Sequence, residues 1–126
     1  MTERNIAIRR ILLPRDTNHR GEVFEGALLA EIDLAGAVEA RLYTPHDVAT
    51  VAVKEVQFKQ PVRVGDVVTF FTTLLKLGTS SIHVQVDVEA SRDGLTSPHA
   101  VTAAEVVYVA IQRNEDGSIQ KVPLTP

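Results

Sequence analysis

The most regular pattern in the chain is the alternation of apolar and polar residues in the segment IHVQVDVEA, residues 82–90. Isoleucine or valine stands at each even position from 82 to 88, and polar residues stand between them. A period of two is typical of a β-strand with one face in the core. Strand-like segments also occupy residues 6–14, 48–58, 67–77 and 99–112, largely separated by short polar turns. Strands joined by tight turns predict an antiparallel sheet.

Between the first two predicted strands, nearly every residue from about Gly26 to Tyr43 is a good helix former, and Pro45 marks the end. On a helical projection, one broad apolar arc contains Leu28, Leu29, Ile32, Ala35, Gly36 and Tyr43. An adjacent stripe of small residues contains Gly26, Ala30, Asp33, Ala37 and Ala40. A helix that is apolar or small almost all round is predicted to be buried, and it is the only available cover for the sheet.

Asp33 is the only charged residue within this stripe of glycine and alanine. A carboxylate moved out of water without partners costs several kcal/mol or changes its pKa. Two interpretations therefore remain open: Asp33 reaches solvent as an ordinary polar residue, or a functional site makes use of it. Its small neighbours leave room beside the carboxylate for a ligand or another chain.

Composition narrows the functional classes. The 126 residues suit one domain, 1–126, in which we expect residues from about 114 to 126 to form a loosely ordered tail. A net charge of −3 gives no basic field for nucleic acid or an anionic membrane. No apolar run approaches the roughly 20 residues of a membrane helix, so we expect a cytoplasmic protein. The absence of cysteine excludes a thiolate zinc site and a cysteine nucleophile, and the scattered histidines predict no metal site.

Four segments carry a resemblance to a known family: PRDTNHRGEVFEGALLAEIDLAGAVEA, VQFKQPVRVGDVV, LGTSSIHVQVDV and VVYVAIQRNEDGSIQKVP. In this order they resemble the hotdog-fold acyl-CoA thioesterases, the YciA-like enzymes and cytosolic acyl-CoA hydrolases. The resemblance implies an α+β hotdog fold, in which one long central helix is wrapped by a five- to six-stranded antiparallel sheet. It also implies hydrolysis of acyl-CoA to a free acid and coenzyme A in fatty acid metabolism, without a cofactor.

The resemblance assigns catalytic roles to three residues. Asp33 matches the family's aspartate, a general base or nucleophile on the thioester, and Gly26 matches the glycine whose helix start holds the thioester oxygen. Glu22 stands where the family has Asn or Asp, although an acid near a helix start also serves simply to compensate the helix dipole. The resemblance and the available basic residues predict the following substrate and coenzyme A contacts: Asn18, Phe24, Glu25, Lys59, Arg63, Gly78, Thr79, Ser80 and Ser81.

The spacing of the catalytic residues bears on assembly. Gly26 and Asp33 are seven residues apart, or about 10 Å along a helix axis, too far for both to reach one carbonyl easily. A two-fold homodimer solves this by placing the helix start of one chain against Asp33 of the other. The resemblance extends this expectation to a homohexamer built as a trimer of dimers.

Two other interpretations stay open. Glu25 replaces a glycine of the family motif, and basic residues for coenzyme A are few, which favours a non-catalytic acyl-CoA-binding module. A hotdog hydratase or dehydratase needs a histidine a few residues from its aspartate, and Leu-Ala-Gly-Ala-Val follows Asp33 here. We therefore rank the thioesterase first and the hydratase last.

Overall fold

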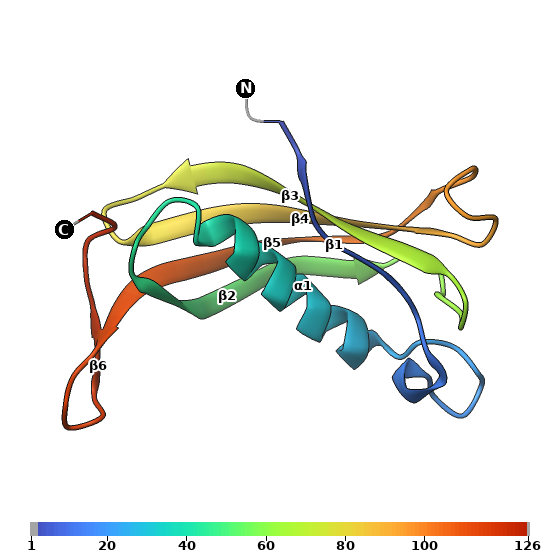
Figure 1. The fold of residues 1–126 in the computed structure, drawn as a ribbon, viewed down its shortest axis with the longest axis horizontal. Coiled ribbons are helices and arrows are strands. Elements are labelled where there is room, and N and C mark those ends of the chain that lie inside the picture. The colour runs from blue at the N-terminus through green and yellow to red at the C-terminus, as the bar shows by residue number, and fades with distance from the viewer. Residues whose placement is uncertain (1–2, 126) are drawn as a thin grey trace.

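The computed structural model describes residues 3–125. Its elements, in chain order, are β1 (Asn5–Ile11), the short 3-10 helix η1 (Pro14–Asp16), α1 (Glu25–Ala40), β2 (Asp47–Phe58), β3 (Val67–Leu77), β4 (Ser81–Ser91), β5 (His99–Arg113) and β6 (Ile119–Lys121). The strands form one antiparallel sheet in the order β1-β3-β4-β5-β2, with β6 paired to β5. The helix α1 crosses one face of this sheet (Figure 1). This confirms the predicted α+β architecture of one helix and a five- to six-stranded sheet, although the sixth strand, β6, lies in the segment that we expected to be a loose tail.

The alternation in β4 places its apolar residues in the core. Ile82, Val84, Val86 and Val88 are each at most 1% exposed, while the intervening side chains are only half-buried. The buried face of α1, including Ile32, packs onto this side of the sheet. A period of two on a half-buried strand is therefore sufficient to identify the core face.

The prediction that α1 is buried almost all round is wrong for the single chain. Leu34 and Val38 are 58% and 51% exposed, because the sheet covers only one side of the helix. The helix also ends at Ala40 rather than near Tyr43. There the chain tightens into a turn in which the Tyr43 N–H bonds the carbonyl of Ala40. One side of α1 thus remains open and apolar.

The prediction of a loosely ordered tail is also wrong for residues 114–125, and residue 126 lies outside the described residues. β6 pairs with the end of β5, and the N–H of Val122 donates to the carbonyl of Ala110. Leu124 is buried; its N–H bonds the Thr79 carbonyl, and its own carbonyl accepts from the Thr44 hydroxyl. Backbone pairing and one buried leucine therefore hold this segment against the sheet.

A buried carboxylate anchors the C-terminal half of α1. Glu39 is 1% exposed, and its Oε1 accepts from the Asn5 amide at 2.9 Å and the Thr72 hydroxyl at 2.8 Å. Its Oε2 accepts from the Tyr43 hydroxyl at 2.5 Å. Burial and this carboxylate raise the pKa of Tyr43 to about 12. Three neutral donors thus satisfy the acid and tie α1 to β1 and β3.

Candidate active site on helix α1

Asp33 lies midway along α1 and is half-buried. Its Oδ1 accepts a hydrogen bond of 2.5 Å from the hydroxyl of Thr50 on β2. Its Oδ2 has no hydrogen-bond partner within residues 3–125. The carboxylate is therefore oriented by one donor, while its second oxygen stays available for a reacting group.

The backbone of Asp33 is fixed from the sheet. Tyr108 on β5 is 1% exposed, and its hydroxyl donates to the main-chain carbonyl of Asp33 at 2.6 Å. Burial and the Asp33 charge hold the pKa of Tyr108 above its ordinary value of 10. The tyrosine reaches the helix because residue 36 is a glycine: a β-carbon there would lie 3.0 Å from two ring carbons and still closer to the hydroxyl.

We expect Gly36→Ala to lower the free energy of unfolding by about 1–3 kcal/mol, since an added methyl overpacks a rigid contact. Tyr108→Phe removes the atom that clashes most. The double variant Gly36→Ala/Tyr108→Phe should therefore lose less free energy of unfolding than the sum of the losses of the two single variants. Urea unfolding at one protein concentration measures all three. Strict additivity would mean that the helix shifts without pressing on Tyr108.

A pocket of about 240 Å³ opens at the start of α1, between the loop before the helix and the chain after β2. Four of the predicted residues line it, namely Asn18, Glu22, Glu25 and Lys59. Arg20, which sequence reasoning overlooked, also lines it and pairs with Glu22 at 3.1 Å. Glu22 is thus partly neutralised within its own loop, and in one chain it does not share a pocket with Asp33.

The helix start beside this pocket has no side-chain cap. The N-cap residue is Phe24, whose ring lies 3.0 Å from where a β-carbon of Gly26 would stand. The first backbone N–H groups of a helix have no partner within the helix, and the helix dipole makes them attractive to negative charge. The missing side chain at Gly26 makes room for the Phe24 ring beside these N–H groups.

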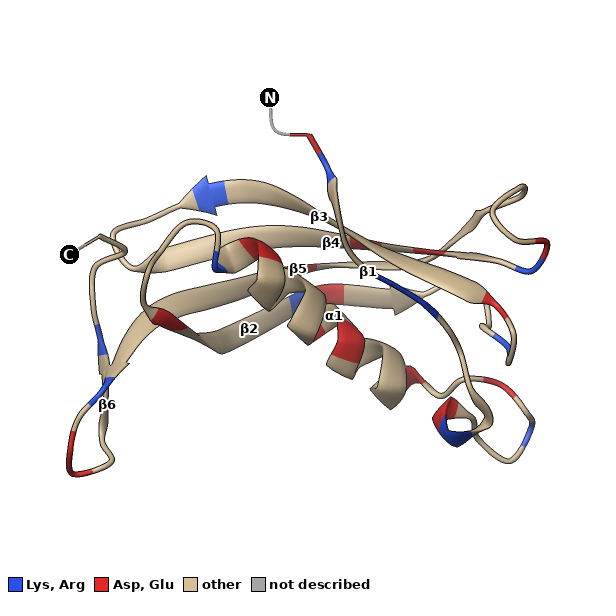
Figure 2. Ribbon diagram, viewed as in Figure 1, with Lys and Arg blue, Asp and Glu red and all other residues tan. Residues whose placement is uncertain are grey.

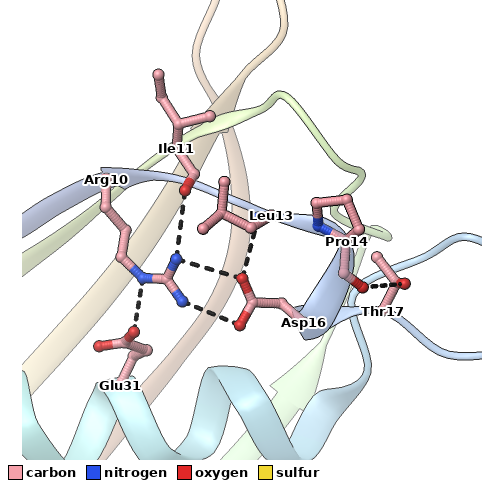
Figure 3. A network of polar contacts seen from close by, with 7 residues as sticks. All are labelled: Arg10, Ile11, Leu13, Pro14, Asp16, Thr17 and Glu31. Atoms are coloured by element: carbon pink, nitrogen blue, oxygen red, sulfur yellow. Dashed lines mark hydrogen bonds and ion pairs between the residues drawn. The ribbon is translucent and has the colours of Figure 1, made fainter.

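The loop that precedes the helix is held by one arginine of β1. The Arg10 Nε donates to Glu31 of α1 at 2.6 Å, and its terminal nitrogens contact both oxygens of Asp16 at 3.1 and 3.3 Å (Figure 3). The helix α1 contains four acidic residues and no basic one, whereas β1 carries the two arginines Arg9 and Arg10 (Figure 2). Charge complementarity between strand and helix therefore places the loop.

Asp16 makes this anchoring dependent on pH. The N–H of Leu13, followed by Arg10, holds the pKa of Asp16 below its ordinary value of 3.8. The contribution of ionised Asp16 to the free energy of unfolding is therefore present in full above pH 3.8, and it is lost as the pH falls through the lowered pKa.

We expect Asp16→Asn to lower the free energy of unfolding by about 1.5–3 kcal/mol at pH 7, the range for hydrogen bonds to a charged group. The gap to wild type should narrow in acid, as wild-type Asp16 becomes protonated. The urea unfolding midpoints of both proteins, measured at pH 7 and in acid, test this, and Asp93→Asn, a change at an exposed aspartate, is the matched control. A gap that persists unchanged in acid would contradict an ionic origin.

Other predicted residues lie elsewhere in the single chain. Arg63 pairs through its backbone with Glu22 but lines a shallow depression with Arg92. The residues Gly78, Thr79, Ser80 and Ser81 lie at the β3–β4 turn, beside the C-terminal segment. The 11 residues of β3, about 35 Å in length, separate this turn from the opposite end of the strand (Figure 1). The pocket residues Pro61 and Val62 come shortly before that opposite end. One chain therefore does not bring all the predicted residues together, and their roles stay predictions.

Sequence reasoning missed Thr50, Tyr108 and Glu39. Thr50 and Tyr108 are ordinary strand residues in the sequence, and only strand pairing brings them to Asp33. No local motif marks them. The periodicity of β2, once its register with β5 is known, is the signal that identifies Thr50 as facing the helix.

One long helix laid across an antiparallel sheet is the arrangement of the hotdog fold, and here the Asp33 carboxylate lies on the flank of that helix that faces β2. The thioesterase superfamily model matches residues 20–97. The chain is 32% identical to the acyl-CoA thioester hydrolase YciA of Salmonella typhimurium, over 94% of this chain and 90% of that protein. The chain therefore belongs to the thioesterase superfamily, which confirms the resemblance and the expectation of a hydrolase.

Solved structures agree with this assignment. A hexameric hotdog-fold thioesterase of Campylobacter jejuni superposes with a TM-score of 0.83 and 38% identity, covering 94% of this chain and 89% of that one. A hexameric thioesterase of Yersinia pestis gives a TM-score of 0.82 and 32% identity, covering 94% of this chain and 95% of that one.

Within residues 3–125, no helix is long and apolar enough to cross a membrane.

Proposed function

We propose that this protein hydrolyses acyl-CoA thioesters to a free carboxylic acid and coenzyme A, with Asp33 as the central residue. The observation that carries the proposal is the half-buried Asp33 carboxylate, which has one oxygen held by Thr50 and the other open. The relative of Salmonella typhimurium, named as an acyl-CoA thioester hydrolase, supports the choice of thiol carrier. The reaction is proposed to take place in the cytoplasm and to need no cofactor.

In the proposed mechanism, the open oxygen of Asp33 either takes a proton from water or attacks the thioester carbonyl carbon itself. The carbon–sulfur bond breaks, coenzyme A leaves as the thiol, and water supplies the new oxygen and the protons. Unpaired N–H groups at the helix start near Gly26 stabilise the oxygen as it gains charge. Thr50 orients the carboxylate, and Tyr108 holds its helix turn in place.

The active site is proposed to be shared between two chains. In one chain, Asp33 does not line the pocket at the helix start, so the carboxylate and the N–H groups proposed to hold the thioester oxygen lie apart. A two-fold partner brings the second half, and the exposed apolar side of α1 offers a surface for it. The hexameric relatives of Campylobacter jejuni and Yersinia pestis favour a trimer of such dimers.

The function is tested by the release of free thiol from a panel of acyl-CoAs, with short, long and aryl acyl groups. Hydrolysis of any member supports the proposal, and the preferred member names the acyl class. Binding of coenzyme A without hydrolysis would instead establish the acyl-CoA-binding module. Glu25, which lines the pocket and stands where the family motif has glycine, would then be the residue to replace by Gly.

A further inference from the structure

A second pocket, of about 190 Å³, lies on the face of the sheet opposite α1. On β3 the side chains of Val68, Phe70 and Thr72 point into the core beneath the helix, and Thr72 bonds Glu39 of α1. The alternate residues Val67, Thr69 and Phe71 face the other way and line this pocket. We call it the outer-face pocket, and its walls come from β1 and from the loop between β4 and β5.

The charges in the outer-face pocket do not cancel. The Arg4 guanidinium lies 3.0 Å from the Glu89 carboxylate and 3.6 Å from the centre of the Phe71 ring, so its charge is compensated. Arg9 uses its Nε to donate to Thr69 at 2.8 Å. The two terminal nitrogens of Arg9 have no hydrogen-bond partner within residues 3–125, which leaves one positive charge for a ligand.

A buried hydroxyl at the same pocket lacks a partner. Ser91, the last residue of β4, lines the pocket and is only 1% exposed. Its Oγ makes no hydrogen bond within residues 3–125. A buried polar atom without a partner costs about 1–3 kcal/mol, and such an atom in a folded protein calls for an explanation. A ligand oxygen that displaces the side chains now covering Ser91 would supply the missing partner.

We propose that the outer-face pocket binds a small organic carboxylate. The carboxylate pairs with the terminal nitrogens of Arg9 in the side-by-side geometry that guanidinium favours, and one oxygen accepts from Ser91. Leu95 and Pro98 form an apolar wall from the β4–β5 loop, against which the hydrocarbon part of the ligand packs. One uncompensated positive charge beside an apolar wall suits a monoanion with a hydrocarbon body better than inorganic phosphate.

The test is calorimetric titration of the intact protein with benzoate and butyrate, and separately with inorganic phosphate. Wild type should bind at least one carboxylate in a saturable way. Arg9→Gln should weaken that binding tenfold or more, and Ser91→Ala severalfold. Arg15→Gln is the matched control, because Arg15 is exposed outside the pocket and its loss should change nothing. Urea midpoints show whether each variant keeps its fold. If Arg9→Gln does not fold, the binding measured with Ser91→Ala decides whether the pocket holds the carboxylate.

The difference between wild type and the Arg9 and Ser91 variants isolates this pocket from any acid that binds beside Asp33. The proposal is overturned if neither carboxylate binds, if all the variants bind alike, or if phosphate binds and the carboxylates do not. None of these outcomes depends on whether the protein hydrolyses thioesters.

Discussion

Asp33→Asn is expected to lower kcat/KM for acyl-CoA hydrolysis a hundredfold or more, equivalent to about 2.7 kcal/mol of barrier. The amide has the same shape, and the Thr50 hydroxyl can still donate to its oxygen. What disappears is the negative charge that takes a proton or attacks the thioester. The release of free thiol, measured for both proteins on the best acyl-CoA of the panel, gives the ratio directly.

Two further variants define what this loss means. Asp47→Asn removes an exposed aspartate at the start of β2 and should leave the rate unchanged. Thr50→Val keeps the shape of the side chain but removes the donor to Asp33, and should cost about tenfold, close to one ordinary hydrogen bond. If Asp33→Asn kept more than a tenth of the activity while still binding coenzyme A, another group would have to carry the chemistry.

Glu39→Ala is expected to lower the free energy of unfolding by about 3 kcal/mol. The change leaves a cavity at a site that is 1% exposed and removes the acceptor of three donors. Thr72 is fully buried and has no access to water as a replacement, whereas Asn5 is exposed and does. Urea unfolding at a fixed protein concentration measures the loss, because assembly makes apparent stability depend on concentration.

Glu39→Gln is the matched control for this prediction. The amide oxygen can keep the bonds from Asn5 and Thr72, while its NH₂ group donates to the Tyr43 hydroxyl, which then accepts. The expected loss is therefore below about 1 kcal/mol. An equally large loss in Gln and Ala would show that the negative charge, rather than the hydrogen bonding, holds α1 at this point.

Much of the fold follows from local pattern, because each half-buried element repeats its own period. The alternation in β4 and the run of helix formers in α1 identified the core of the molecule. β6 was missed because its three residues gain their order from β5 and from the packing of Leu124, not from their own sequence.

The candidate site was predictable where chemistry stands out in the sequence and unpredictable where it depends on contacts between distant segments. Asp33 stood out as a charge among small residues. Its partner Thr50 lies on another element, and a contact of this kind follows from strand register alone. Glu39 resembled any polar helix residue, because its three partners come from three different segments of the chain.

The two tyrosine hydroxyls that hold α1 also make the helix visible in solution. The chain has no tryptophan, so its near-ultraviolet absorbance and emission come mainly from Tyr43 and Tyr108. One hydroxyl bonds Glu39 near the end of the helix and the other bonds Asp33 at its middle. Undocking of α1 would change both signals together, and an alkaline titration would show both phenols ionising above the usual 10 while the helix stays in place. The protein therefore carries its own optical probe of helix docking, free of any attached dye.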